Sequence, residues 1–499
     1  MKTNLSWLLL TLAGCWQYDT PKDTDPVVDS EDSEGDTDTD TDTDTDTDTD
    51  TDTDTDTDTG VQSVLDIEIT GPSPTEQFDE CGEVCFSAII YREGAPDPGA
   101  IVDIELDGPG YVGSALVADA KGRVEACASG LDVGTWNFAV SAQDGNSYEE
   151  RKREYGSVTI VPFGRDLGFD RSDEILDELP WTPDFERYAA NPVFEPSGDT
   201  EEFDAVGVLL GTVVKQGNRY YMWYAGQQVL GEDYLIGEAE SGDGLSWTKT
   251  GWNQDISPGS GIDGDWKKMS TNSPFLMYDG GVWKLYYTGR REEGGDLSIG
   301  LATSDRYQEI YGSSGSAFHV YDLPEGENPV FDHVDEEEGW GGEAVAHPSV
   351  VYAEGYYHLY YSTGRHRVGY AMSADGVSWT RYCKNPILTG EEGMSWEMAR
   401  IKSTELAWYD GYYIMTYTGG DTGSFKLGWA MSKDGLHWAK AEDPVLDVDT
   451  DSDWERQSVI GGTLLVDESA GKLKMWYGGT YSTGSAIGFA DADLPTSLP

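Results

Sequence analysis

The sequence predicts an all-β protein: a five-bladed β-propeller, preceded by an Ig-like β-sandwich and a disordered Asp/Thr-rich tether. Two observations predict the propeller. A unit of short alternating strands recurs five times, and an Asp-Gly turn follows the second strand in three copies. Apolar–polar alternation bounded by Gly, Asp and Asn is typical of short antiparallel strands, and Asp-Gly favours a tight hairpin. Repeats of four short strands at periods of 56–74 residues indicate sheets arranged radially.

The repeated unit is clearest in residues 356–388, and its parts can be followed through all five copies. The first strand reads MWYAG, LYYTG, LYYSTG, MTYTGG and MWYGG, starting at Met222, Leu285, Leu359, Met415 and Met475. The second strand reads IGEA, IGLA, VGYA, LGWA and IGFA, starting at Ile236, Ile299, Val368, Leu427 and Ile487. A marker aromatic residue precedes each first strand: Phe203, Trp266, Trp340, Trp396 and Trp454.

Residues 1–15, MKTNLSWLLLTLAGC, have the shape of an export signal, with one basic residue and an apolar run too short to span a bilayer. The ending Leu-Ala-Gly-Cys resembles the bacterial lipoprotein signal, in which the cysteine is acylated and becomes the new N-terminus. The resemblance implies lipidation of Cys15 and a place in the cell envelope, at the outer membrane or the cell surface. An ordinary signal peptide is the alternative.

Residues 16–60 predict an extended, disordered tether. This segment contains twelve Asp-Thr pairs from Asp36 to Thr59 and 19 acidic residues against the single Lys22. Charge repulsion and the lack of apolar side chains leave nothing to offset the entropy lost on ordering. The formal net charge of the whole chain is −61, which argues against nucleic acid and anionic lipid surfaces as partners. The only membrane contact that we expect is the N-terminal lipid.

Residues 61–162 have six or seven short alternating segments separated by Gly and Pro turns, a pattern that predicts an Ig-like sandwich. This region contains Cys81, Cys85 and Cys127, while Cys383 lies far away in the third repeat. A disulfide is expected in an exported protein. Three cysteines leave one of the set unpaired, and the spacing does not say which.

Residues 163–190 are expected to be a connector, and residues 191–499 the propeller. The segment Asn191-Pro-Val-Phe matches three segments that end repeats two to four, at Asn328, Asn385 and Asp443, whereas repeat five has none. We therefore expect residues 191–194 to supply the outer strand of the fifth repeat and close the ring, so that no sheet edge is left open.

The repeats resemble the furanosidase-type propellers of glycoside hydrolase families 43, 32 and 68, over about residues 185–495. In those families a base or nucleophile Asp, a second Asp and a general-acid Glu stand at the starts of inner strands. The resemblance implies Asp204 as base and Glu343 as acid, one and three residues after their marker aromatics. Paired carboxylates suit glycoside cleavage, because one protonates the leaving oxygen while the other activates water or attacks the sugar.

The sequence departs from that pattern in the second repeat, where Lys267, Lys268, Ser270 and Asn272 stand in place of the middle Asp. The other polar residues near inner-strand starts are candidates for ligand binding: His347, Arg400, Glu397, Glu455, Arg456, Lys268 and Asn272. A structural role for His347 and pairing of the arginines with the glutamates are the alternatives. The acidic run from Asp447 to Asp453 can be a calcium loop or a solvated connection; no other cofactor or metal is expected.

Two functional classes follow from the sequence. The first is an exported, lipid-anchored glycoside hydrolase or related glycan-active enzyme. The second is a non-catalytic propeller that binds glycan or protein, which the lysines of the second repeat favour. Carbohydrate is the expected partner in the first class, and we expect the protein to be a monomer. Two carboxylates facing each other across an accessible funnel would distinguish the enzyme.

Overall fold

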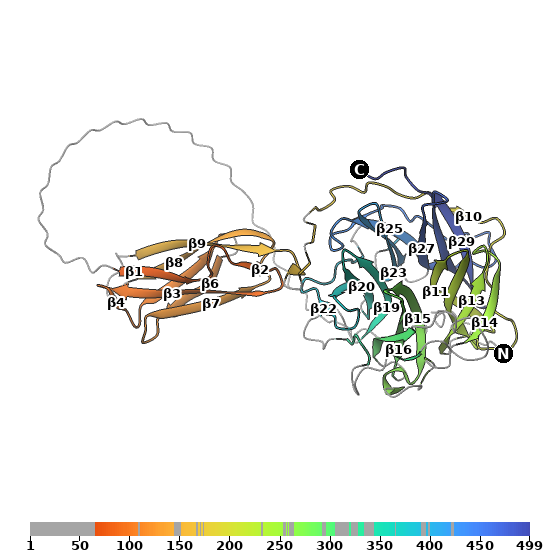
Figure 1. Cartoon of the computed structure of the whole chain (residues 1–499), viewed down its shortest axis with the longest axis horizontal. Helices are drawn as coiled ribbons and strands as arrows, with labels where there is room; N and C mark the ends of the chain where they lie inside the picture. Colours follow the sequence, from red (N-terminus) through yellow and green to blue (C-terminus); the bar gives the residue numbers. More distant parts are fainter. Residues whose placement is uncertain are drawn as a thin grey trace, which may run out of the picture.

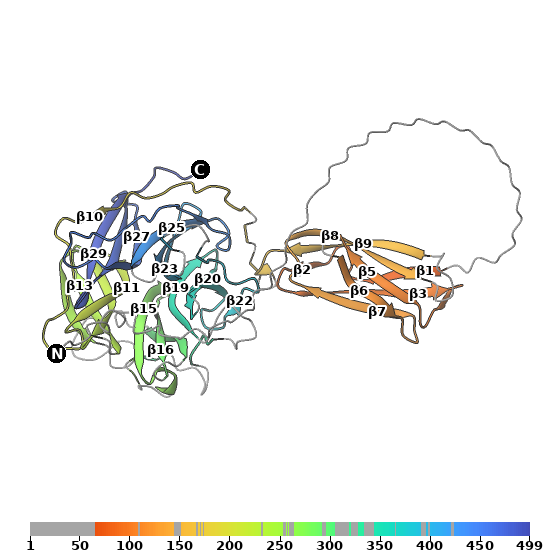
Figure 2. The same ribbon diagram turned by 180° about the vertical axis from the view of Figure 1, so that it is seen from behind.

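The computed structural model describes two β-rich parts that lie end to end (Figure 1, Figure 2). It describes residues 65–499 except 108–109, 144–150, 166–167, 170, 173, 231–232, 253–255, 257, 259–263, 292–295, 305–318, 321–327, 334–343, 365, 391–395, 398–399 and 421–423. Within these limits the chain is all-β, apart from a short 3-10 turn, η3 (Gly264–Lys267). Within the same limits, no helix has the length and apolar character that a membrane crossing requires.

The first part consists of two sheets that share one core. One sheet contains β1 (Leu65–Gly71), β3 (Glu83–Arg92), β4 (Ala95–Pro96) and β7 (Arg123–Ser129). The other runs β2 (Gln77–Asp79), β9 (Arg151–Val161), β8 (Gly134–Gln143), β5 (Ile101–Leu106) and β6 (Gly110–Val117). Alternate residues of β3 are buried, as expected of a strand with one face in a core. Phe86 of β3 packs edge-on against Phe138 of β8, with ring centroids 4.9 Å apart.

The second part is a β-propeller. Its first three groups of strands are β11 (Gly207–Gln216), β12 (Arg219–Gln227), β13 (Tyr234–Ser241), β14 (Trp247–Trp252); β15 (Ser270–Asp279), β16 (Val282–Arg290), β17 (Leu297–Ser304), β18 (His319–Val320); and β19 (Val345–Ala353), β20 (Tyr356–Thr363), β21 (Val368–Ser373), β22 (Thr380–Arg381). The last two are β23 (Arg400–Tyr409), β24 (Tyr412–Gly420), β25 (Phe425–Ser432), β26 (Ala439–Lys440); and β27 (Ser458–Asp467), β28 (Lys472–Tyr481), β29 (Gly484–Asp493) with β10 (Glu186–Arg187). We call β11, β15, β19, β23 and β27 the inner strands, because each contacts the next and β27 contacts β11. The inner strands therefore form a closed cycle.

The Asp-Gly hairpins form as the sequence predicts. In the third group Gly376 N–H donates to Ser373 Oγ at 2.8 Å, and Asp375 Oδ1 accepts from two backbone N–H groups. The same bonds recur after Ser241 and Ser432. A side chain that bonds to its own turn in this way mimics a further backbone bond. Each glycine lies at a φ of 75–79°, which a residue with a Cβ adopts at a cost.

The prediction of ring closure is confirmed in its pairing. Ile487 of β29 bonds to Phe194 in both directions, at 2.8 and 3.1 Å, and the pair forms an antiparallel bridge. The same bridge joins Phe331 to Ile299, Leu388 to Val368 and Leu446 to Leu427. The closing segment begins earlier than expected, because β10 already pairs with β29. The outer edge of the last group therefore comes from residues 186–194.

The expectation of an unpaired cysteine is wrong, because Cys383 supplies the fourth sulfur. Cys85 bonds to Cys127 within the first part, across β3 and β7. Cys81 bonds to Cys383 of the propeller. Beside this second disulfide, Lys384 Nζ lies 3.0 Å from a Glu80 carboxylate oxygen and 2.8 Å from an Asp132 carboxylate oxygen. The two parts are thus joined by a covalent bond and by ion pairs, not by the connector alone.

The connector also packs into the propeller. Phe163 and Phe169 belong to the apolar cluster between the third and fourth groups of strands. The buried Arg171 guanidinium donates to Tyr370 Oη at 2.8 Å and lies 4.9 Å from the centre of the Phe169 ring. A guanidinium stacked on rings can be buried at lower cost than an ammonium group, because it is more weakly hydrated. Phe163, Phe169 and Arg171 are therefore part of the propeller core.

Candidate functional site

The structure places Asp204 in a buried ion pair inside the first group of strands. Its carboxylate is 1% exposed. Lys249 Nζ, on the outermost strand β14, lies 2.7 Å from Asp204 Oδ2, and Tyr224 Oη donates to the same oxygen at 2.9 Å. Burial and the neighbouring carboxylate raise the pKa of Tyr224 well above its ordinary value. Asp204 thus links the segment that leads into the inner strand β11 to the outermost strand β14 of the same group.

Glu397 and Glu455 occupy the same position after their marker aromatics and make the same kind of contact. Lys440 Nζ, on the outermost strand β26, lies 2.5 Å from Glu397 Oε1. Arg187 Nε, on the outermost strand β10, lies 3.0 Å from Glu455 Oε1. All three acidic side chains are at most 2% exposed. The recurrence indicates that the residue after the marker aromatic fastens the start of the inner strand to the outermost strand of the same group. The sequence pattern alone cannot distinguish such a role from catalysis.

The aromatic marker explains why this position turns inward. A Cβ placed on Gly289 would meet the Trp266 ring at 2.1 Å and Lys267 Cβ at 2.8 Å, and Gly226 meets Phe203 and Asp204 in the same way. The ring therefore packs against a glycine of the strand next to the inner strand, on β16 or β12, and the Cβ of the residue after the marker lies near the same glycine. Lys267 is 1% exposed and lies over the Tyr287 ring.

Several expected site residues lie elsewhere or outside the described residues. Glu343 and Cys15 fall in segments that the structure does not describe. Arg456 is exposed and bonds to Asp453, and Lys268 is exposed. At the other end of the acidic run, Asp447 pairs with Lys426 at 2.7 Å.

A second set of predicted residues does come together, on the inner strands near their first residues. Ser273 Oγ of β15 lies 2.8 Å from His347 Nδ1 of β19 and donates to Asn272 Oδ1 at 3.0 Å. Ser273 and His347 both have positive φ, 49° and 51°, and both lie where the strand register shifts. Such a β-bulge redirects one side chain out of the regular alternation. Here it brings two neighbouring inner strands into polar contact.

Side chains of the third and fourth groups complete this set. Burial is the main cause that lowers the pKa of His347 to about 3, and Lys402 on β23 and the protonated form of His366, in the turn between β20 and β21, act in the same direction. Burial, Lys402 and Arg400 lower the pKa of His366 to about 4. Both imidazoles are therefore neutral at neutral pH. We call this set the axial site: Asn272, Ser273, His347, His366, Arg400 and Lys402.

The axial site can bind hydroxyl groups and anions. The neutral His347 and the Asn272 amide offer both donors and acceptors. Lys402 and Arg400 supply positive charge in a protein whose net charge is strongly negative. Sequence reasoning selected Asn272, His347 and Arg400, but it missed Ser273, whose contribution depends on the bulge of β15, and His366, which lies in the turn between β20 and β21.

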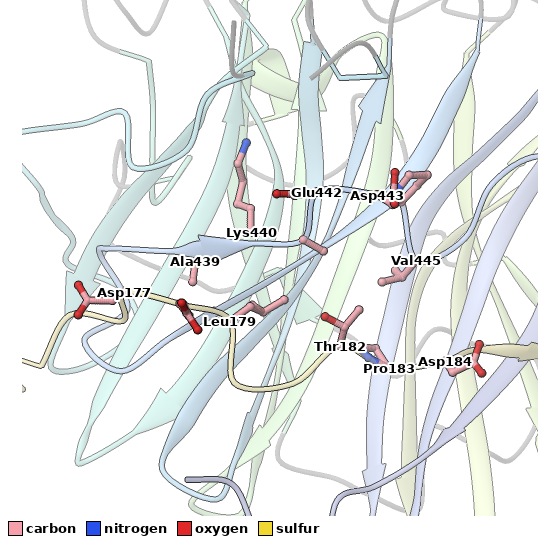
Figure 3. A pocket seen from close by; sticks show the side chains of 13 residues that line it. Asp177, Leu179, Thr182, Pro183, Asp184, Ala439, Lys440, Glu442, Asp443 and Val445 are labelled. Carbon is pink, nitrogen blue, oxygen red and sulfur yellow. The ribbon is translucent and has the colours of Figure 1, made fainter. Parts of the chain in front are cut away.

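A separate cavity of about 710 Å³ lies between the connector and the outer edge of the fourth group (Figure 3). Asp177 and Asp184 line it from the connector, and Lys440 and Glu442 from β26 and the residues after it. Lys440 turns its amine toward Glu397. This cavity shares no residue with the axial site.

The comparisons with known proteins support no single family. No family model matches the chain. An uncharacterized protein of Mycobacterium tuberculosis is 26% identical over 253 residues, which cover 48% of this chain and 76% of that protein. A 1,2-beta-oligomannan phosphorylase of Thermoanaerobacter sp. is 30% identical over 118 residues, which cover 21% of this chain and 39% of that enzyme. Among solved structures, a putative glycoside hydrolase from Parabacteroides distasonis aligns with a TM-score of 0.49 at 16% identity, covering 64% of this chain and all of that one.

Proposed function

We propose that the protein binds glycans at the axial site and cleaves a glycosidic bond there. The observation that carries the proposal is the convergence of His347, Asn272 and Lys402 from three neighbouring inner strands. Neutral donors and acceptors beside fixed cations suit a hydroxyl-rich ligand and stabilise negative charge. The segment similar to the oligomannan phosphorylase supports a carbohydrate as the ligand.

Phosphate is the nucleophile that these cations favour over water. Lys402 and Arg400 both lie near His366, because each of them lowers its pKa, and two neighbouring cations can bind a dianion. In the resulting reaction phosphate oxygen forms a bond to the anomeric carbon, while the glycosidic oxygen leaves with a proton. The product is then a sugar phosphate, whereas hydrolysis gives a free sugar.

A product assay tests the proposal. The purified protein is incubated with β-1,2-mannobiose, longer β-1,2-mannans and arabinan-, xylan- and fructan-type glycosides, with and without inorganic phosphate. We expect cleavage that requires phosphate and yields sugar 1-phosphate. Release of free sugar at the same rate without phosphate would assign hydrolysis instead.

Non-catalytic glycan binding is the second candidate, and one observation favours it. Asp204, the base that the family resemblance implied, is held by Lys249, and Lys267 occupies the equivalent place in the second group. If glycans bind to the wild-type protein and no sugar or sugar phosphate appears, this candidate holds.

We propose further that the ring is five-bladed, that the first part is an Ig-like stalk, and that the Asp/Thr-rich segment tethers both to a lipid on Cys15 at the cell envelope. The Leu-Ala-Gly-Cys ending carries the proposal of the lipid. The full-length protein should partition into a detergent phase, and Cys15→Ser should move it to the aqueous phase. Unchanged partitioning of the variant would exclude the lipid.

A further inference from the structure

Glu405 is the one acidic residue among the equivalent positions of the inner strands, all of which are described. It lies on the inner strand β23, three residues after Lys402. The bulges place it in register with one residue on each of the other inner strands: Thr212, Phe275, Ser349 and Thr463. The ring therefore carries one carboxyl group at this level.

The side chain of Glu405 faces the next inner strand, β27. Glu405 pairs with Thr416 across β23 and β24, and residues paired in this way point to the same face of a sheet. The Thr416 hydroxyl donates to the carbonyl oxygen of Gly462 at 2.8 Å. Because Thr416 reaches β27, Glu405 also points toward β27.

The facing strand leaves space at this point. Gly461 lies at the bulge of β27 with a φ of 53°, and a Cβ placed on it would meet no atom within 4 Å. The equivalent residues of the second and third groups are Ser273 and His347, which form the polar contact of the axial site. Open space thus lies on β27, the strand that Glu405 faces, at the bulge position where β15 and β19 place site residues.

Glu405 is enclosed by protein and yet keeps accessible surface. Burial raises the pKa of its carboxyl well above the ordinary value. Within the described part of the chain no hydrogen bond or ion pair of its side chain is recorded. A carboxyl group whose pKa is raised by burial is suited to donate a proton.

We propose that Glu405 is the proton donor of the axial site, acting on the glycosidic oxygen of a glycan that occupies the space beside Gly461. The inference rests on the proposed function. As the bond from the anomeric carbon to the glycosidic oxygen breaks, its electron pair stays on that oxygen, which takes the proton of Glu405. The nucleophile, phosphate or water, bonds to the anomeric carbon, and the proton that it releases restores the carboxyl group.

The first test compares Glu405→Gln with Glu468→Gln, a control at an exposed carboxyl in the turn between β27 and β28. We expect the Glu405 variant to cleave the natural glycan 100-fold or more slowly, in the range that general acids contribute, with glycan affinity within a few-fold of wild type. An aryl glycoside with a good leaving group needs no protonation, so the same variant should cleave it at a rate near that of wild type. Equal loss on both substrates, or wild-type rates on both, would overturn the proposal.

The second test needs no turnover. The infrared difference spectrum of wild type minus Glu405→Gln should contain the C=O band of a protonated carboxyl at neutral pH, and this band should shift when glycan is added. A missing band, or a band that bound glycan leaves unchanged, would contradict the assignment.

The third test fills the space beside Gly461 with a larger side chain on β27. Gly461→Phe should weaken glycan binding at least tenfold, while Gly461→Ser, which copies Ser273 at the same φ, should change it little. Unchanged affinity of the Phe variant would show that no glycan enters there. If the wild-type protein neither binds nor cleaves any glycan of the panel, the proposed function fails and this inference with it; if wild type and Glu405→Gln cleave equally, only the inference fails.

Discussion

The buried acidic residues that follow the marker aromatics fasten the inner strand to the outermost strand of the same group. Asp204, Glu397 and Glu455 each hold a cation of the outermost strand of their own group. From the sequence, a lone acid at an inner-strand start is equally consistent with catalysis. The distinction depends on where Lys249, Lys440 and Arg187 lie, which is a property of the folded sheet.

Removing one partner of such a pair should be costly. Lys249→Met leaves the Asp204 carboxylate buried without its cation, so we expect the free energy of unfolding to fall by about 3–5 kcal/mol. Urea denaturation measures this change. The double variant Lys249→Met with Asp204→Asn should recover much of the loss, because no charge is then left unpaired. A double variant less stable than the single variant would contradict this account.

His437 predicts a pH dependence of stability. The hydrogen bond to Asp434, at 2.6 Å, raises the pKa of His437 above its unfolded value of 6.5, and Glu80 across the interface acts in the same direction. A raised folded pKa stabilises the protein fully below the unfolded pKa, and the contribution disappears as the pH rises through the folded pKa. The difference in Tm between wild type and His437→Gln should therefore be largest below about pH 6 and smallest in mildly alkaline buffer. A difference that grows with pH would contradict the assignment.

At the scale of the elements, the strand repeats could be predicted from the alternation of apolar and polar residues and from the turn residues. The hairpins form where Asp-Gly predicts them. The bulges of the inner strands could not be predicted from the sequence. Ser273, His347 and Gly461 share no residue type, yet all three adopt positive φ at equivalent points of the inner strands. Their shared geometry comes from the pairing of each inner strand with the strand next to it in the same group. This geometry brings the residues of the axial site together.

Ring closure gives a matched pair of variants. Phe194 is 4% exposed, pairs with β29 and packs on Tyr224 at 4.8 Å, so it joins the last group to the first. Phe331 is equally buried and packs on Tyr361 at 4.8 Å. We expect Phe194→Ala and Phe331→Ala to destabilise by similar amounts, about 3–5 kcal/mol each. A much smaller effect at Phe194 would mean that the ring is not closed by this segment.

At the scale of the whole molecule, the sandwich and the propeller are fastened to each other by a disulfide and ion pairs, whereas the sequence predicted only a connector between them. The cysteine spacing could not reveal this, because the partner of Cys81 lies 302 residues away in the propeller and is brought next to it only by the tertiary structure. The ion pairs of Lys384 with Glu80 and Asp132 lie at the same interface.

The disulfide variants test this coupling. The double variant Cys81→Ser with Cys383→Ser should show two calorimetric transitions, since the parts can then unfold separately, while the wild-type protein should show one. The double variant Cys85→Ser with Cys127→Ser is the control, and it should lower the stability of the sandwich. If the wild-type protein shows two transitions at the same temperatures as the variant without the Cys81–Cys383 bond, the interface does not couple the unfolding of the two parts.

The most direct test of the central claim is a crystal structure of the protein with the glycan that the product assay selects, beginning with β-1,2-mannobiose. We predict electron density for a sugar within hydrogen-bonding distance of His347 and Lys402, with its glycosidic oxygen near Glu405. A sugar bound instead in the cavity between the connector and β26, with the axial site occupied by solvent alone, would contradict the account.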